Sequence, residues 1–262
     1  MHLVEPKVYL LGFNQIWEPD FTAWLSNFGN ESVEHFATKN GTISDPELLV
    51  EFAARRCYKS FAPLLNPNVK KIRKDSRDYM KNIIESGHGR VLEHANFTFA
   101  FEFVSRVFTH EIVRHAAGCT YAQESLRYVR LTDIGFWLPE EAQKNDALRS
   151  LLTATVSDLE ERQRELATMF ETVLGGDNFN AKKVLTSMFR RIAPEGLATG
   201  MVATFNARAC RHIMELRSTQ HAEEEMQLVI RQFGTILTSM FPLIFGDYEL
   251  TANGFETKNR KV

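Results

Sequence analysis

The sequence has few of the features that mark secreted, membrane-bound or polyanion-binding proteins. Its 262 residues include three cysteines, Cys57, Cys119 and Cys210, an odd number without the paired spacing of a metal site or a disulfide framework. No uninterrupted apolar stretch approaches the roughly 18 residues of a membrane span, and no targeting segment is recognisable. The net charge of -2 offers no general field for nucleic acids. These absences favour a cytoplasmic protein that binds neither membranes nor nucleic acids.

The composition is that of an ordinary globular protein. Hydrophobic residues make up 44% of the chain and charged residues 24%. A chain of this length can bury a full core without disulfides or metals. We find no internal repeat, low-complexity tract or linker, so we expect a single domain over residues 1–262.

The clearest local pattern is a strand. Phenylalanine occupies every second position from Phe97 to Phe103, and this period of two predicts a half-buried strand. A second strand is expected at Val8–Phe13. Ser105 then stands where a helix N-cap is expected, directly before a polar segment that begins at Arg114.

Helical patterns occupy most of the remaining chain. Ser44, Asp45 and Pro46 supply capping residues for a helix over Glu47–Ser60. Glycines at 87 and 89 would end a helix over Val69–Ser86. Further helices are expected over most of residues 139–174, Lys182–Ile192, Glu195–Leu216 and Ala222–Phe241. Together with the strands, these patterns predict an α+β fold with a central sheet flanked by helices.

The polar segment from Arg114 to Tyr128 has an anion-binding composition. It places two arginines, a histidine, the carboxylate of Glu124 and the hydroxyl of Ser125 within fifteen residues. Polar residues also gather upstream, at Glu93 and His94, and downstream. The downstream residues are Asn206, Arg208, His212, Arg217 and His221.

These three segments resemble the flavin-dependent thymidylate synthases, the ThyX family. The family signature is arginine, histidine, arginine, then seven or eight residues, then serine followed by arginine and tyrosine. The resemblance spans roughly residues 50 to 240. It implies the thymidylate synthase-complementing fold, in a homotetramer with active sites between subunits. The implied activity is reductive methylation of dUMP to dTMP, with methylenetetrahydrofolate as carbon donor and NADPH reducing bound FAD.

The resemblance also assigns roles to residues. It implies that Arg217 contacts the uracil ring and that His94 lies beside flavin and folate, so both are candidate catalytic residues. Candidate substrate-binding residues are Glu111, Arg114, Glu124, Ser125, Arg127, Arg190 and Arg217. Candidate cofactor-binding residues are His94, Arg114, His115, Glu124, Asn206, Arg208, His212 and His221. No metal is implied.

Simpler interpretations of single residues remain open. His94 could be a buried histidine satisfied by a backbone carbonyl. Arg114 and His115 could be cations that complement a helix C-terminus. Arg191 competes with Arg190 for the role of nucleotide-binding arginine. His110 and His115 are five residues apart and diverge by about 140° around a helix, so we expect no zinc site there.

Two positions depart from the family pattern. Ala116 replaces the second arginine of the signature, and Glu111 stands where a glutamine is expected. Losing one charge-assisted contact costs about 1.5 to 3 kcal/mol, which Arg130 or Arg211 could offset. Two alternatives therefore stay open. One is a paralogue with altered nucleotide chemistry, such as pyrimidine hydroxymethylation, and the other is a non-catalytic nucleotide-binding regulatory protein.

Overall fold

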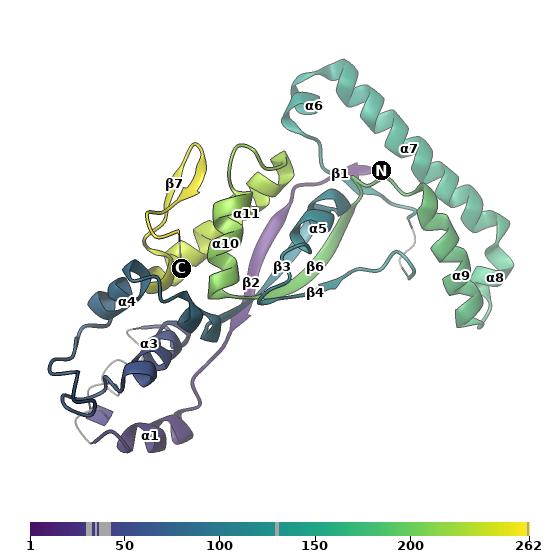
Figure 1. Ribbon diagram of the computed structural model, residues 1–262. Coiled ribbons are helices and arrows are strands. Elements are labelled where there is room, and N and C mark those ends of the chain that lie inside the picture. The colour runs from purple at the N-terminus through teal and green to yellow at the C-terminus, as the bar shows by residue number, and fades with distance from the viewer. Residues whose placement is uncertain (30–32, 35, 37–42, 129–130, 261) are drawn as a thin grey trace.

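The computed structural model describes residues 1–29, 33–34, 36, 43–128, 131–260 and 262. A central sheet lies between a helical region at one end and a helical arm at the other (Figure 1). Within the described residues, no helix combines the length and the apolar character needed to cross a membrane. The mixed helix and sheet architecture confirms the predicted α+β class.

The central sheet has four antiparallel strands. Their order is β2 (Lys7–Phe13), β3 (Asn96–Ser105), β6 (Ala198–Asn206) and β4 (Cys119–Gln123). The two strands expected from the sequence are confirmed as parts of β2 and β3. Strand β4 lies inside the polar signature segment, which is therefore part of the sheet edge rather than a loop throughout.

Strand β6 corrects one prediction. The helix expected over Glu195–Leu216 is wrong in its first half, because residues 198–206 form a strand and only α10 (Ala207–Arg217) is helical. β6 pairs with β3 on one side and β4 on the other. Met201, Ala203 and Phe205 alternate toward the core along it, and this two-sided pairing outweighs the helical preference of the flanking residues.

The other helices mostly agree with expectation. Ser44 and Glu47 form a capping box at the start of α3 (Asp45–Tyr58). The helix expected over Val69–Ser86 is shorter, since Asp75 accepts from the amide of Asp78 and starts α4 at Ser76. The remaining helices are α1 (Glu18–Ser26), η1 (Gly89–His94), α5 (Arg106–Ile112), α6 (Glu140–Lys144), α7 (Asp146–Met169), α8 (Glu171–Gly175), α9 (Phe179–Phe189), η2 (Arg190–Ile192), α11 (Glu224–Met240) and α12 (Pro242–Phe245).

One face of the sheet carries the main core. Phe99 on β3 lies 4.6 Å from Phe233 of α11 between ring centroids, and Phe101 lies 5.6 Å from Phe108 of α5. The opposite face is open. There, register places Tyr9, Ala100, Val202 and Ala122 in one row across the four strands. Tyr9 is 48% and Val202 40% exposed, so this row presents apolar surface.

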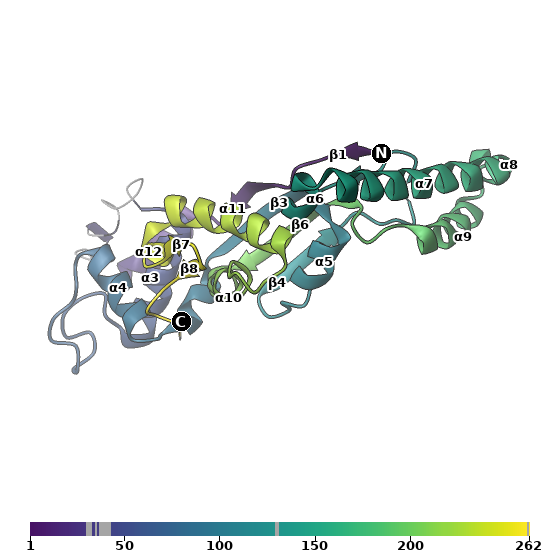
Figure 2. The ribbon, with the colours of Figure 1, turned by 90° about the horizontal axis from the view of Figure 1, so that it is seen from above.

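Two smaller pairs of strands complete the fold. β1 (His2–Leu3) pairs in parallel with β5 (Gly135–Phe136), close to where the helical arm of α6 to α9 begins. β7 (Glu249–Thr251) and β8 (Gly254–Glu256) form a hairpin beside α10 and α11. Figures 1 and 2 both show the arm extending away from α10.

Candidate active site

The C-terminal end of α10 and the segment after α5 meet at Arg217. The Arg217 Nε donates to Nε2 of His115 at 3.0 Å, and Nη1 donates to Oε2 of Glu111 at 3.0 Å. The Arg217 side chain is 25% exposed, and that of Glu111 is 32% exposed. The guanidinium is therefore held by two neighbours and still reaches solvent, where a ligand can meet it.

His115 is a neutral imidazole in this arrangement. Burial, followed by electrostatic interaction with Arg217 and His212, lowers the pKa of His115 to about 4. Because Nε2 accepts from Arg217, the single ring proton belongs on Nδ1. The centroid of the His212 ring lies 5.6 Å from that of the His115 ring, and His212 is exposed.

The chain around His115 is fixed by contacts that the sequence did not reveal. Ser105 is the N-cap of α5, as expected, since its Oγ accepts from the amide of Phe108 at 3.1 Å. The Tyr121 hydroxyl lies 2.8 Å from the carbonyl of Ile112 and 2.7 Å from that of His115. The Gln123 amide donates to Thr109 in the middle of the helix. Cys119, Tyr121 and Gln123 occupy alternate positions, and this alternation was the sequence signal that could have indicated the contacts of Tyr121 and Gln123.

A glycine lets the signature segment approach α10 closely. Gly118 has a φ of +73°, and a Cβ there would lie 2.2 Å from Nδ2 of Asn206. The backbone amide of Asn206 donates to the Gly118 carbonyl at 2.9 Å. The Asn206 side chain caps α10 by accepting from the backbone amide of Ala209. Asn206 thus joins the N-terminal end of α10 to the segment that follows His115.

Exposed polar side chains gather near this end of α10. Arg208 is paired with Glu93 at 2.9 Å and remains 47% exposed. His94, at the end of η1, has an exposed side chain, which excludes the buried-histidine interpretation. His221 is exposed too, but it follows the other end of α10, in the segment that leads to α11. These residues are accessible to a ligand.

The other signature residues lie elsewhere in the chain. Glu124 follows β4, and its carboxylate lies with that of Glu102 beside Gly200, where an added Cβ would approach both. Burial and the neighbouring Glu124 raise the pKa of Glu102. The Oγ of Ser125 accepts from the amide of Arg127 at 3.3 Å. None of these contacts involves Arg217.

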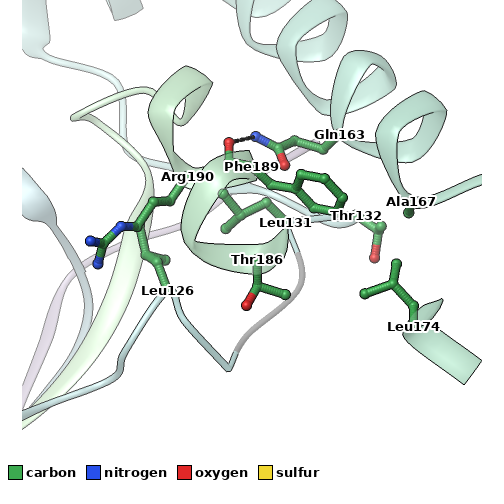
Figure 3. Close-up of a pocket in the computed structure, with 9 residues that line it drawn as sticks. All are labelled: Leu126, Leu131, Thr132, Gln163, Ala167, Leu174, Thr186, Phe189 and Arg190. Atoms are coloured by element: carbon green, nitrogen blue, oxygen red, sulfur yellow. Dashed lines mark hydrogen bonds between the residues drawn. The ribbon is translucent and has the colours of Figure 1, made fainter. Parts of the chain in front are cut away.

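A basic hollow lies on α9. Arg127 lines it together with Lys183, Ser187 and Arg191. Arg190 instead lines a small apolar cavity of about 10 Å³ between α7 and α9, with its guanidinium pointing away from the other lining residues (Figure 3). A cavity of that size holds at most a water molecule. The hollow therefore favours Arg191 over Arg190 as the partner of Arg127.

The structure thus divides the predicted residues into separate groups. Glu111, His115, His212 and Arg217 come together, and Asn206 and Arg208 lie at the other end of α10. Arg114 is exposed just after α5. Arg127 lies with the arm, and Figures 1 and 2 both show α9 well away from α10.

The two departures from the family pattern have different consequences. Ala116 is exposed, and its carbonyl accepts from the amide of Cys119. Arg211 cannot replace the missing cation, because it is fully buried and bound to Asp247. Arg130 lies outside the described residues. Glu111 forms an ion pair with Arg217 at 3.0 Å.

The histidines considered for zinc have different partners. His110 lies 3.3 Å from Glu195, whereas His115 faces Arg217. Cys119 is half-buried, and burial raises the pKa of its thiol. A thiol with a raised pKa is a poor nucleophile at neutral pH, so we assign Cys119 no covalent role.

Taken together, the fold and the site define an α+β protein whose exposed arginines and histidines surround positions suited to anionic, aromatic ligands. Comparison with known proteins gives the family. The model of the thymidylate synthase complementing proteins matches residues 41–243. The flavin-dependent thymidylate synthase of Mycobacterium marinum is 34% identical over 215 residues, covering 80% of this chain and 83% of the relative.

A second relative agrees with the first. The flavin-dependent thymidylate synthase of Corynebacterium diphtheriae is 34% identical over 213 residues, covering 80% of this chain and 82% of the relative. The chain therefore belongs to the thymidylate synthase complementing protein family. A solved UMP/dUMP methylase, PolB from Streptomyces cacaoi bound with 5-Br dUMP, has the same fold. Its TM-score is 0.62 at 17% identity, over 94% of this chain and 96% of that one.

Proposed function

We propose that this protein converts dUMP to dTMP, with methylenetetrahydrofolate as carbon donor and NADPH as reductant through bound FAD. Its two relatives named above are called flavin-dependent thymidylate synthases. The observation that carries the proposal is the fixed guanidinium of Arg217, held by His115 and Glu111 and still partly exposed. Attack from C5 of uracil builds negative charge on the ring, which such a guanidinium stabilises.

The neutral His115 contributes to this arrangement. Because its pKa is lowered to about 4, its Nε2 accepts from Arg217 at neutral pH and does not repel it. The two contacts fix the plane of the guanidinium before substrate arrives. Preorganised donors of this kind need no reorganisation during the reaction.

Residues along α10 and beside both of its ends suit a flavin dinucleotide. Arg208, His94, His212 and His221 are exposed donors, and an arginine beside several imidazoles matches a ligand with a diphosphate and an aromatic ring. We therefore assign them, with Asn206 and His115, to the flavin. The flavin, when bound, supplies the hydride chemistry, and the protein orients it against the substrate.

We expect the purified protein to bind FAD and to form dTMP. The test is titration with FAD, followed by mass analysis of the product from dUMP, methylenetetrahydrofolate and NADPH. Saturable micromolar FAD binding with a methylated product supports the proposal. A hydroxymethylated product would favour the paralogue, and no flavin binding would favour the regulatory protein. Rescue of a thymidine auxotroph gives an independent readout.

We further propose that each active site is shared between subunits of a homotetramer. Within one chain, the basic hollow containing Arg127 is lined mainly by residues of α9, and Figures 1 and 2 show α9 apart from α10, the helix that ends at Arg217. The open face of the sheet carries the apolar row of Tyr9, Ala100, Val202 and Ala122, which a second copy can cover. A shared site would bring the phosphate-binding arginine of one subunit to the uracil-binding arginine of another.

Coexpression of two inactive variants tests this arrangement. We expect Arg127→Ala and Arg217→Ala each to be nearly inactive alone, but their mixture to regain about a quarter of the parental activity, because random pairing restores both arginines at about a quarter of the sites. If each site belonged to one chain, the mixture would stay inactive. Coexpression of Arg127→Ala with itself under two tags is the control.

A further inference from the structure

Glu225 is a buried acid on the first turn of α11. Its side chain is 2% exposed, and both carboxylate oxygens face Ser105. Oε1 accepts from the Ser105 amide at 2.6 Å, and Oε2 accepts from the Ser105 hydroxyl. Ser105 is itself 4% exposed, so this contact is shielded from water.

This contact fixes the start of α5. Ser105 ends β3 and is the N-cap of α5, with its Oγ accepting from the amide of Phe108. Because the Ser105 hydroxyl donates its proton to Glu225, a lone pair of Oγ stays aimed at Phe108. Glu225 therefore sets the orientation of the cap as well as the position of the strand end.

The same contact links the two chain segments that carry the candidate active site. From Ser105, α5 leads to Glu111 and His115, which bind Arg217. From Arg217, the chain passes through residues 218–223 to Glu225 at the start of α11. The contact between Glu225 and Ser105 thus joins the segment that carries Glu111 and His115 to the segment that follows Arg217.

We propose that Glu225 is a positioning residue for the Arg217 site, holding α5 so that Glu111 and His115 meet the guanidinium. This inference rests on the proposed function for its catalytic consequence. Glu225 acts only through Ser105 and α5.

Small movements of α5 are sufficient to matter. The helix has seven residues and is about 10 Å long, so a tilt of about 6° at its start shifts its end by about 1 Å. A displacement of that size can lower catalytic rates by up to about a hundredfold. Tyr121 holds the carbonyls at the far end, so Glu225 and Tyr121 fix the helix from its two ends.

Burial and the contact with Ser105 act in opposite directions on the ionisation of Glu225. Burial raises its pKa from 4.5 to about 7, against the lowering effect of the Ser105 hydrogen bonds, and the charge of Glu223 raises it further. A folded-state pKa above the unfolded value adds stability at low pH, and that contribution is lost as pH rises through about 7. The fold is therefore less stable with the ionised form, which accepts both hydrogen bonds from Ser105, than with the protonated form.

Other charged groups lie on the elements that the contact between Glu225 and Ser105 joins, α11 on one side and β3 with α5 on the other. They are Glu223 and Glu224 on α11, Glu102 on β3, and Arg106, His110 and Glu111 on α5. Glu223 acts on Glu225 directly, and Glu111 acts on Glu223. The experiment must therefore separate Glu225 from its neighbour charges, which a charge-matched variant on the same turn achieves.

Glu225→Gln mimics the protonated acid and tests the proposal. On the flavin-loaded enzyme at pH 8, we expect turnover of dUMP to fall at least about tenfold. Flavin content should be unchanged, and thermal stability equal to or above the parent. The parental activity should fall as pH drops through about 7, whereas the variant should lack this step. Hydrogen exchange of amides 106–115 should be faster in the variant at pH 8.

Two further variants keep the result interpretable. Glu224→Gln removes a charge from the same turn, where its carboxylate binds the amide of Glu140, and should leave turnover unchanged. Ser105→Ala removes the hydroxyl while keeping Glu225, and it serves as the test if Glu225→Gln does not fold. We expect it to show the same loss of turnover and the same faster hydrogen exchange. Parental turnover and exchange in the folded Glu225→Gln variant would overturn the proposal. If the parent itself fails to methylate dUMP, the proposed function is wrong, while the exchange of amides 106–115 still decides the positioning role.

Discussion

Replacing Arg217 by lysine should lower the turnover of dUMP by more than about tenfold at saturating substrate, which corresponds to at least about 1.4 kcal/mol of transition-state stabilisation. Lysine keeps the charge but loses the planar fork that donates to His115 through Nε and to Glu111 through Nη1. A contact that strengthens as charge accumulates on uracil affects turnover more than nucleotide binding.

Steady-state kinetics with saturating dUMP and folate measure this effect. Reduction of bound flavin by NADPH should continue at the parental rate, because that step needs no charge on uracil. The control is Arg162→Lys on the exposed face of α7, where Arg162 pairs with Asp158 and Glu165, and we expect no change. Parental turnover in Arg217→Lys, or a change confined to flavin binding, would contradict the role of Arg217.

Replacing Arg211 by methionine should reduce the free energy of unfolding by about 3 to 5 kcal/mol, because it leaves a largely buried carboxylate without its cation. Arg211 is fully buried and donates to both oxygens of Asp247, at 2.6 and 2.8 Å. Burial alone would raise the pKa of Asp247, but hydrogen bonds from Arg211, Thr257 and Asn259 and the charge of Arg211 lower it overall.

Denaturant unfolding at two pH values measures this loss. A depressed folded-state pKa contributes stability that is complete above the unfolded value of 3.8 and is lost as pH falls through the lower folded-state value, so the difference in stability between parent and variant should narrow as pH falls below 3.8. Arg162→Met removes a two-partner arginine from an exposed helix face and should leave the unfolding midpoint unchanged. Equal stability of Arg211→Met and the parent at pH 7 would show that this buried pair is replaceable.

Local sequence patterns predicted the elements that their own residues stabilise. The capping box at Ser44 and Glu47 fixes the start of α3, and the alternating phenylalanines of β3 need only one buried face. Strand β6 was missed because its state depends on β3 and β4, which lie about 100 and 80 residues away in sequence. The start of α4 was misplaced because the cap at Asp75 was not recognised.

The candidate site was predictable in part. Resemblance to the family supplied Glu111, His115 and Arg217, and the structure shows that these three are in contact. It could not supply the contacts of Tyr121 and Gln123, which follow from the pleat of β4. Glu225 had no sequence signal, because an acid in the first turn of a helix is ordinarily a partner of the helix dipole.

The length of helix α10 fixes the distance between Asn206 and Arg217. Asn206 caps its first turn and Arg217 ends its last, so eleven residues span about 16 Å between the two ends of the helix. Gain or loss of one residue would shift that interval by about 1.5 Å and turn Arg217 by about 100° around the axis. On the proposed function, the length of α10 therefore fixes the distance between Asn206, assigned to the flavin, and Arg217, assigned to the uracil ring.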